Sequence, residues 1–198
     1  MNGEKTNGAG IVAGLRPARR VCRMIAFASL LFGSLAAAHA EPWQSVGKWV
    51  IAGTPQLGGC AMATTYPHGG FISLTVVADE AGAQNWELLI SEEGWRGIAS
   101  EKMYPVDLFF DDQRSEGLHI TMRGYKTPPG SHMITNALVF DFLGESEIDK
   151  FIADGFARDS QMVLSAGGRR LSALNLEDHG AARDELLKCF AARAQFGA

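Results

Sequence analysis

Hydrophobic and polar residues alternate with a period of two in much of the chain after residue 40. The clearest case is Leu118–Met122, where three apolar side chains would share one face of a strand and His119 and Thr121 the other. Other β-branched or apolar runs lie between Gly, Pro and Asp residues, which is typical of strands and turns. The predicted strands cover residues 43–52, 60–65, 71–78, 86–90, 104–110, 118–122, 137–142, 161–164 and 170–174, with a brief extended piece at 95–98.

A period of 3.6 residues replaces the alternation near the end of the chain and predicts a helix over Asp178–Ala194. Its inward face would hold Ala182, Leu186, Cys189 and Phe190. Asp178 is a suitable N-cap, because its side-chain oxygen can accept from the unpaired N–H groups of the first turn.

On the outer face of this helix, Asp184 precedes Lys188 by four residues, which predicts a solvated ion pair. A shorter helix is predicted to begin at Ser146 and to end at Gly155.

The pattern as a whole predicts a mainly β (α+β) fold of eight to nine short strands. It would be a single antiparallel β-sandwich or barrel-like domain with one short helix and a C-terminal capping helix.

The first 40 residues have a different character. Arg16, Arg19, Arg20 and Arg23 precede the apolar run Met24–Ala37, and the sequence Ala-His-Ala follows at positions 38–40. A basic segment, a short apolar run and an A-x-A exit are typical of a secretory signal peptide. The run is shorter than the roughly 20 residues that a membrane span needs. We therefore expect residues 1–40 to be an N-terminal extension and a signal peptide cleaved after Ala40, and residues 41–198 to form one exported β-rich domain in the periplasm or outside the cell.

Removal of this leader changes the charge of the chain. The leader holds five of the 18 Lys and Arg residues and one of the 22 acidic ones, so the processed chain would carry 13 basic and 21 acidic residues and a formal net charge of −8. An acidic surface argues against nucleic-acid partners and against binding to anionic membranes. We expect no stable membrane insertion after cleavage.

Cleavage would also remove Cys22 and leave two cysteines, Cys60 and Cys189. A pair of cysteines in an exported chain predicts a structural disulfide. The alternatives are two separate buried thiols or a redox site, although a redox site usually has a C-x-x-C pair, which this sequence lacks.

Trp49-Val50, Cys60 and the tail that ends Leu186-Leu187-Lys188-Cys189 resemble small exported bacterial proteins of the invasion-associated locus B type. The similarity is scattered over most of the predicted domain, but no family pattern covers residues 107–142. The resemblance implies a periplasmic or secreted protein of uncharacterised function without a demonstrated enzymatic activity, and it implies no functional residue beyond the cysteine pair.

Residues for catalysis are not arranged in a known local motif. The histidines after the leader are His68, His119, His132 and His179, and no G-x-S-x-G sequence accompanies them. His68 and His132 are typical of turns, His119 of a solvent-facing strand position and His179 of a first helical turn. The sequence therefore predicts no catalytic residue. A hydrolase that uses His119 or His68 with nearby carboxylates stays open as an alternative, because the residues of a catalytic triad can be far apart in the sequence and close in the fold.

Metal and cofactor sites are not predicted either. Neither H-x-x-x-H nor C-x-x-C occurs, and Asp111, Asp112 and Glu116 are more typical of a solvated turn than of a Ca²⁺ site. Of the four tryptophans (Trp43, Trp49, Trp86 and Trp95), which could line a groove for a sugar or peptide, we expect most in the core and Trp43 exposed.

These observations favour a non-enzymatic exported protein that binds a partner in the cell envelope, such as an envelope protein, a peptide or a peptidoglycan fragment, without a cofactor. A sheet edge could accept a partner strand. A purely structural role in the envelope is the remaining alternative.

We predict that the exported, processed protein has no free thiol until it is reduced and two thiols per chain afterwards. Thiol titration in denaturant, with and without prior reduction, measures this directly. Two reactive thiols in the unreduced protein would contradict the disulfide.

Overall fold

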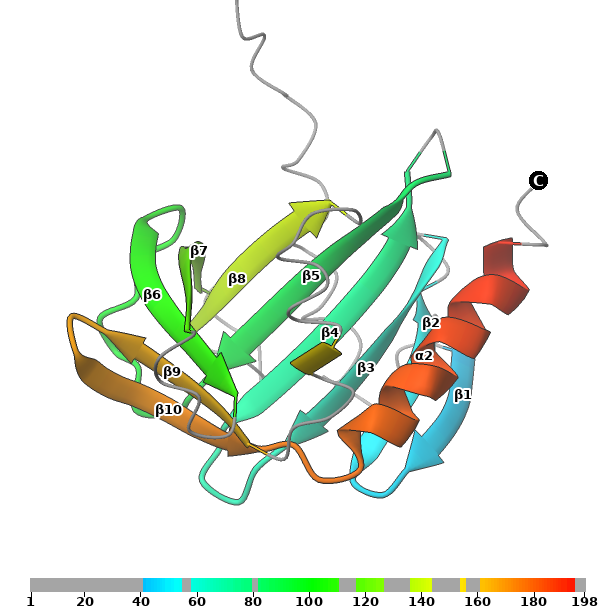
Figure 1. Ribbon diagram of the computed structural model, residues 1–198, viewed down its shortest axis with the longest axis horizontal. Coiled ribbons are helices and arrows are strands. Elements are labelled where there is room, and N and C mark those ends of the chain that lie inside the picture. The colour runs from blue at the N-terminus through cyan, green and yellow to red at the C-terminus, as the bar shows by residue number, and fades with distance from the viewer. Residues whose placement is uncertain are drawn as a thin grey trace, which may run out of the picture.

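The computed structural model describes residues 41–54, 58–79, 82–110, 117–126, 136–143, 154–155 and 161–194. These residues form ten strands and one long helix (Figure 1). The strands are β1 (Glu41–Val46), β2 (Trp49–Thr54), β3 (Gly59–Thr65), β4 (Phe71–Ala78), β5 (Gln84–Ser91), β6 (Met103–Phe110), β7 (Leu118–Lys126), β8 (Asn136–Leu143), β9 (Gln161–Ala166) and β10 (Arg169–Asn175). The helix is α2 (His179–Ala194).

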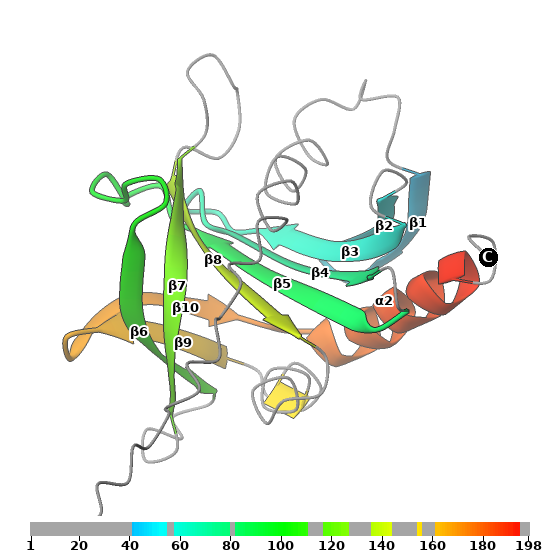
Figure 2. The same cartoon turned by 90° about the horizontal axis from the view of Figure 1, so that it is seen from above.

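All ten strands belong to one antiparallel sheet with the order β1-β2-β3-β4-β5-β8-β7-β6-β9-β10. Figure 2 shows that the sheet bends, so that β6, β9 and β10 stand over the same side of the central strands as α2. The sheet remains open, with β1 and β10 at its ends. The prediction of a mainly β, antiparallel fold with a C-terminal helix is confirmed.

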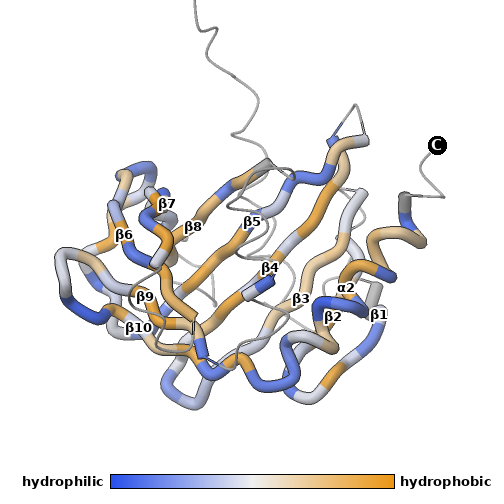
Figure 3. Tube along the Cα trace, viewed as in Figure 1, coloured by the Kyte–Doolittle hydropathy of each residue, from blue (hydrophilic) through white to orange (hydrophobic). Residues whose placement is uncertain are grey.

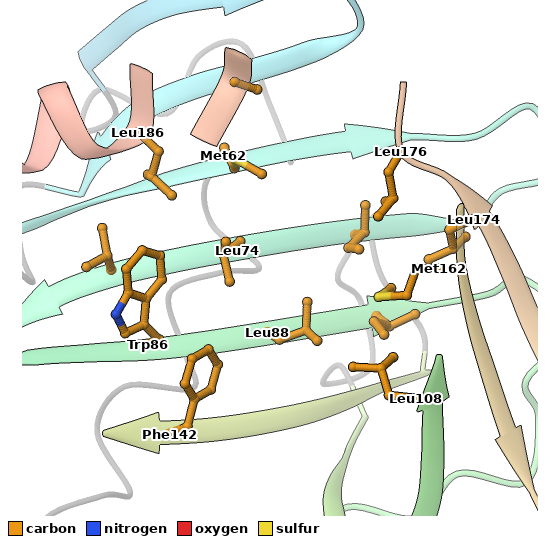
Figure 4. Close-up of a cluster of buried hydrophobic side chains, with 14 of the residues drawn as sticks. Met62, Leu74, Trp86, Leu88, Leu108, Phe142, Met162, Leu174, Leu176 and Leu186 are labelled. Carbon is orange, nitrogen blue, oxygen red and sulfur yellow. The ribbon is translucent and has the colours of Figure 1, made fainter. Parts of the chain in front are cut away.

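We call the side of the sheet that faces α2 the front face and the opposite side the back face. The front face carries the main core, in which side chains from both halves of the bent sheet meet those of α2. Hydrophobic residues follow β3, β4 and β5 in Figure 3. Figure 4 shows the centre of this cluster, which includes Met62, Leu74, Trp86, Leu88, Leu108, Phe142, Met162, Leu174, Leu176 and Leu186.

Helix α2 covers the front face at β2 and β3. Its predicted inward residues, Ala182, Leu186, Cys189 and Phe190, are all buried. The sulfur atoms of Cys60, on β3, and Cys189 lie 1.96 Å apart and form the disulfide that the sequence predicts. The bond joins positions 129 residues apart, and in the chain-entropy model such a loop stabilises the fold by up to about 4–5 kcal/mol.

Hydrogen bonds fasten the end of β10 to the beginning of the sheet. The backbone carbonyl of Asn175 accepts from Nζ of Lys48 and from the hydroxyl of Tyr66, each at 2.8 Å. Nε1 of Trp49 donates to the carbonyl of Glu177 at 2.9 Å. These contacts hold the bend of the sheet and set the point at which α2 begins.

The first predicted strand, residues 43–52, is wrong as a single element. It is a hairpin of β1 and β2, in which Val46 pairs with Trp49 across a two-residue turn. Gly47 has a φ of +53°, and a positive φ at the first central position is what a type II′ hairpin turn requires. This hairpin raises the strand number to ten, compared with the predicted eight to nine.

Some local predictions for the helices differ from the structure. Nζ of Lys188 hydrogen-bonds Oε1 of Glu185 at 2.6 Å, three residues away, whereas Asp184 pairs with Arg183 at 3.7 Å. Asp178 does precede α2, and its carbonyl accepts from the N–H of Ala182. Its φ of +63° is not that of a usual N-cap, however.

Residues 95–98, predicted as a brief extended piece, belong to neither a strand nor a helix. Of the predicted short helix at 146–155, only Asp154 and Gly155 lie within the described residues, and both are helical. The leader, residues 1–40, lies outside them.

The turn at Gly47 gives a sharp test of this arrangement. A Cβ at this position would lie 2.1 Å from Oδ2 of Asp178, in addition to the strain of its positive φ. We therefore expect Gly47→Ala to lower the free energy of unfolding by about 2 kcal/mol or more. Gly97→Ala is the matched control, because a Cβ there meets nothing within 4 Å. It should change the free energy by no more than about 0.5 kcal/mol in urea denaturation, and equal effects of both substitutions would contradict the packing of Asp178 on the turn.

Candidate binding surface on the back of the sheet

The histidines do not gather in one place. His68 is exposed in the turn between β3 and β4, and His119 is exposed on β7. His179 is buried at the start of α2, with Nε2 3.2 Å from the carbonyl oxygen of Gly155. His132 lies outside the described residues.

His119 does contact a carboxylate. Its Nδ1 lies against Oδ1 of Asp107, directly across the β6–β7 pair. A serine is also near, because Ser165 on β9 is the residue paired with Asp107 on the other side of β6. The order across the strands is Ser165, Asp107, His119, which places the aspartate in the middle. A hydrolytic triad needs the histidine between the other two, so this arrangement does not activate Ser165 as a nucleophile.

The side chain of His119 is 84% exposed, so the pair also lacks the enclosure of an active site. Metal binding finds no support in the part of the chain that the structure describes, where no group of three or more His, Cys, Asp or Glu residues could hold an ion. Asp111, Asp112 and Glu116 lie outside it.

The tryptophans belong mainly to the core, as the sequence predicts. Trp49 and Trp86 are buried, and Trp95 packs against the front-face cluster. Trp43 is 44% exposed on β1, and its side chain lies near Glu185 on α2, whose pKa is lowered mainly by Lys188 and to a smaller extent by Trp43. The four side chains therefore do not line a common groove.

The back face carries a second apolar cluster that the sequence reasoning missed. Its members come from four neighbouring strands and none is more than 6% exposed. We call this set the back-face patch: Ala61 and Ala63 on β3, Phe71, Ser73, Thr75 and Val77 on β4, Leu89 on β5, and Ala137 and Val139 on β8.

Strand pairing places these side chains in rows across the sheet. Ala63 is opposite Ser73, Ser73 is opposite Leu89, and Leu89 is opposite Val139. The residues of β3 and β4 in this row are small, so an overlying segment can approach the sheet closely there. The signal in the sequence is β4 itself, Phe-Ile-Ser-Leu-Thr-Val-Val-Ala, which does not alternate cleanly between apolar and polar residues. A strand of that kind is typical of a sheet covered on both faces.

The described elements outside the sheet do not account for the burial of the back-face patch. Helix α2 contacts β1 to β4 on the front face, through the side of the sheet that carries Cys60. Asp154–Gly155 also belong to the front, where Gly155 lies against Phe110 and His179. Figure 2 shows α2, β9 and β10 on one side of the central strands.

Acidic residues border the patch on the side away from β1. Glu87 on β5 is directly opposite Asp141 on β8. Arg123, on β7, bridges Asp141 and Glu101, with its guanidinium nitrogens 3.1 Å and 3.3 Å from their carboxylate oxygens. We call the three carboxylates Glu87, Asp141 and Glu101 the acidic border. Arg123 contacts two of them but is not counted as part of it.

Burial, and then the charge of Asp141, raise the pKa of Glu87 to about 7, although Arg123 acts in the opposite direction. A carboxylate half-protonated near neutral pH lies in an environment that lacks a sufficient counter-charge. Two further polar atoms on this side, Oγ1 of Thr75 and Oδ1 of Asn85, are buried without a hydrogen-bond partner.

The two ends of the sheet are less suited to adding a strand. The register of β1 shifts between Pro42 and Gln44, and that of β10 shifts between Arg170 and Ser172. Bulges, prolines and charges are devices by which sheet edges resist pairing with another chain. The back face is therefore the better candidate for a binding surface.

No protein-family model matches the chain, and neither the curated proteins nor the solved structures that were compared with it include a significant match. The resemblance to the invasion-associated locus B type stays a prediction.

Among the described residues no helix is long and apolar enough to cross a membrane. The disulfide pair is compatible with an oxidising compartment.

The raised pKa of Glu87 predicts a pH-dependent stability of the full chain. Between the ordinary value of 4.5 and about 7, the folded state binds a proton that the unfolded state releases, so stability falls as the pH rises through this window. The loss is on the order of 3 kcal/mol at most.

Glu87→Gln should remove this loss, so that the variant is more stable than the parent at pH 8 and similar to it near pH 4.5 in urea denaturation. Glu93→Gln, at an exposed position, is the control and should keep the parent's pH dependence. Identical profiles for the parent and Glu87→Gln would show that Glu87 is not buried as described.

Proposed function

We propose that residues 41–198 form an exported, non-enzymatic binding module of the cell envelope, and that it holds its partner on the back face of the sheet. The observation that carries the proposal is the back-face patch. It has the composition and burial of the inside of an interface, while the described helix packs on the opposite face. An apolar sheet face needs a second layer in water.

The chemistry of this surface narrows the class of partner. The row Ala63, Ser73, Leu89 and Val139 is mainly apolar, with small residues at one end. The acidic border lies at the other end. A protein or peptide segment with an apolar face and basic residues at one end would satisfy both parts, because burial of apolar area supplies affinity and opposite charges orient the partner.

Export rests on the predicted signal peptide, and a periplasmic or secreted location is part of the proposal. The disulfide supports it, because disulfides persist in oxidising compartments. The resemblance to small exported proteins of the invasion-associated locus B type agrees with a binding role. The alternative hydrolase with His119 or His68 receives less support. The pair of His119 and Asp107 is exposed, and Ser165 lies next to Asp107, whereas a triad needs the serine next to the histidine.

Site-specific photo-crosslinking in cells tests the proposal. Phe71 lies in the back-face patch and can be replaced by p-benzoyl-phenylalanine, which has a related shape. We expect this exported variant to give a discrete crosslinked product with one envelope component after irradiation. The same substitution at Trp43, beside the β1 edge, is the matched control and should not give that product.

A product from position 43 alone would move the binding surface to the β1 edge and contradict the back-face assignment. No product from either position, with both variants exported and oxidised, would count against a binding module.

A further inference from the structure

The burial of the back-face patch in the full chain requires a cover. Ala61, Ala63, Ser73, Leu89 and Val139 are each at most 1% exposed, although they belong to a face without a described helix or loop on it. Val50, on β2, is 40% exposed, whereas Ala52 and Thr54 on the same face of β2 are each 5% exposed, so the covered area reaches the second half of β2. The back-face patch itself extends over four strands, from β3 through β4 and β5 to β8.

We propose that the leader occupies this surface in the unprocessed chain, with the apolar run Met24–Ala37 lying across the back-face patch. Processing after Ala40 would then expose the patch. The occupant is part of the same molecule, so this inference concerns the precursor and stands independently of the partner proposed above.

The composition of the leader fits the surface. Met24–Ala37 consists of apolar and small residues, including Phe27, Leu30, Leu31 and Phe32. The patch offers small side chains on β3 and β4 and larger ones in Phe71, Leu89 and Val139. Burial of these surfaces against each other would remove apolar area from water on both sides.

The lengths also agree. The four strands of the patch extend over about 15 Å, because neighbouring strands are about 4.8 Å apart. Met24–Ala37 would be about 20 Å long as a helix. Residues 38–40 lead directly into Glu41 at the start of β1, which is two strands from β3. Three extended residues reach about 10 Å, enough to cross that interval.

The charges of the leader and of the acidic border indicate the direction in which the leader would cross the patch. A leader that enters from β1 and crosses toward β8 brings its N-terminal part to the side of the patch that holds the acidic border. Arg16, Arg19, Arg20 and Arg23 directly precede the apolar run. They would meet Asp141 and Glu101 on the outer side of the acidic border, where Arg123 is the basic residue that both carboxylates contact among the described residues. Opposite charges at the far end favour this direction of binding.

Photo-crosslinking within the full chain tests the contact. p-Benzoyl-phenylalanine in place of Phe32 should crosslink to a peptide of β3, β4, β5 or β8 in monomeric protein, as identified by mass spectrometry. The same residue in place of Asn7, outside the apolar run, is the control. Crosslinks from position 32 only to front-face peptides, or only between two chains, would overturn the proposal, and the second result would identify another copy as the occupant.

Accessibility of the patch gives an independent measurement. Ser73→Cys is nearly isosteric, and Cys22→Ser removes the leader's own thiol. In this background the rate of maleimide labelling of Cys at position 73 should rise at least about tenfold with Leu31→Lys, which places a charge in the apolar run. Asn7→Lys is the control and should leave the rate unchanged.

Thr121→Cys, at an exposed position on β7, reports whether the fold is intact and should label at one rate in all leader variants. Asp141→Asn with Glu101→Gln should raise the labelling rate of position 73 as well, since it removes the charges that hold the leader's arginines. An unchanged rate with Leu31→Lys would show that another part of the chain covers the patch and would overturn the proposal.

Discussion

The disulfide between Cys60 and Cys189 joins the beginning of the sheet to its last element, and the front of the molecule depends on it. Helix α2 covers only the first strands, and most of the contacts that it makes are with β2 and β3. The bond from Cys60 fixes which side of the helix faces the sheet, so that Ala182, Leu186 and Phe190 complete the core. The hydrogen bonds of Asn175 and Glu177 place the start of the helix beside the same strands.

This arrangement uses one face of the sheet and leaves the other to be explained. The strands at the centre, β3, β4, β5 and β8, have buried side chains on both faces, whereas β7 alternates between buried Ile120 and Met122 and exposed His119 and Thr121. A sheet with one solvated face shows the pattern of β7 throughout. The contrast within a single sheet locates the covered part of the back face and separates it from the solvated part.

The polar groups follow the same division. His119 and Asp107 lie on the solvated part, where water competes for every charge and a contact between the two side chains has little effect on chemistry. Glu87 lies at the border of the covered part, where burial raises its pKa to about 7. The acidic border is therefore the place on this face where charge is sensitive to what binds next to it.

Sequence alone determined the strands, because turn residues and apolar runs are local signals, and it determined the inward face of α2, because 3.6-residue spacing fixes which side chains share a face. It also indicated the pairing of Cys60 with Cys189. It did not separate β1 from β2, because a two-residue turn at Gly47 is too short to show as a break in the pattern of apolar and polar residues.

Only the tertiary structure decided the order β5-β8-β7-β6-β9, which brings Glu87 opposite Asp141 and puts Asp107 between Ser165 and His119. The same order brings the small and apolar residues of four strands into one patch. The physical reason is that a strand's own pattern shows which residues share a face, whereas strand pairing between distant segments sets which faces become neighbours.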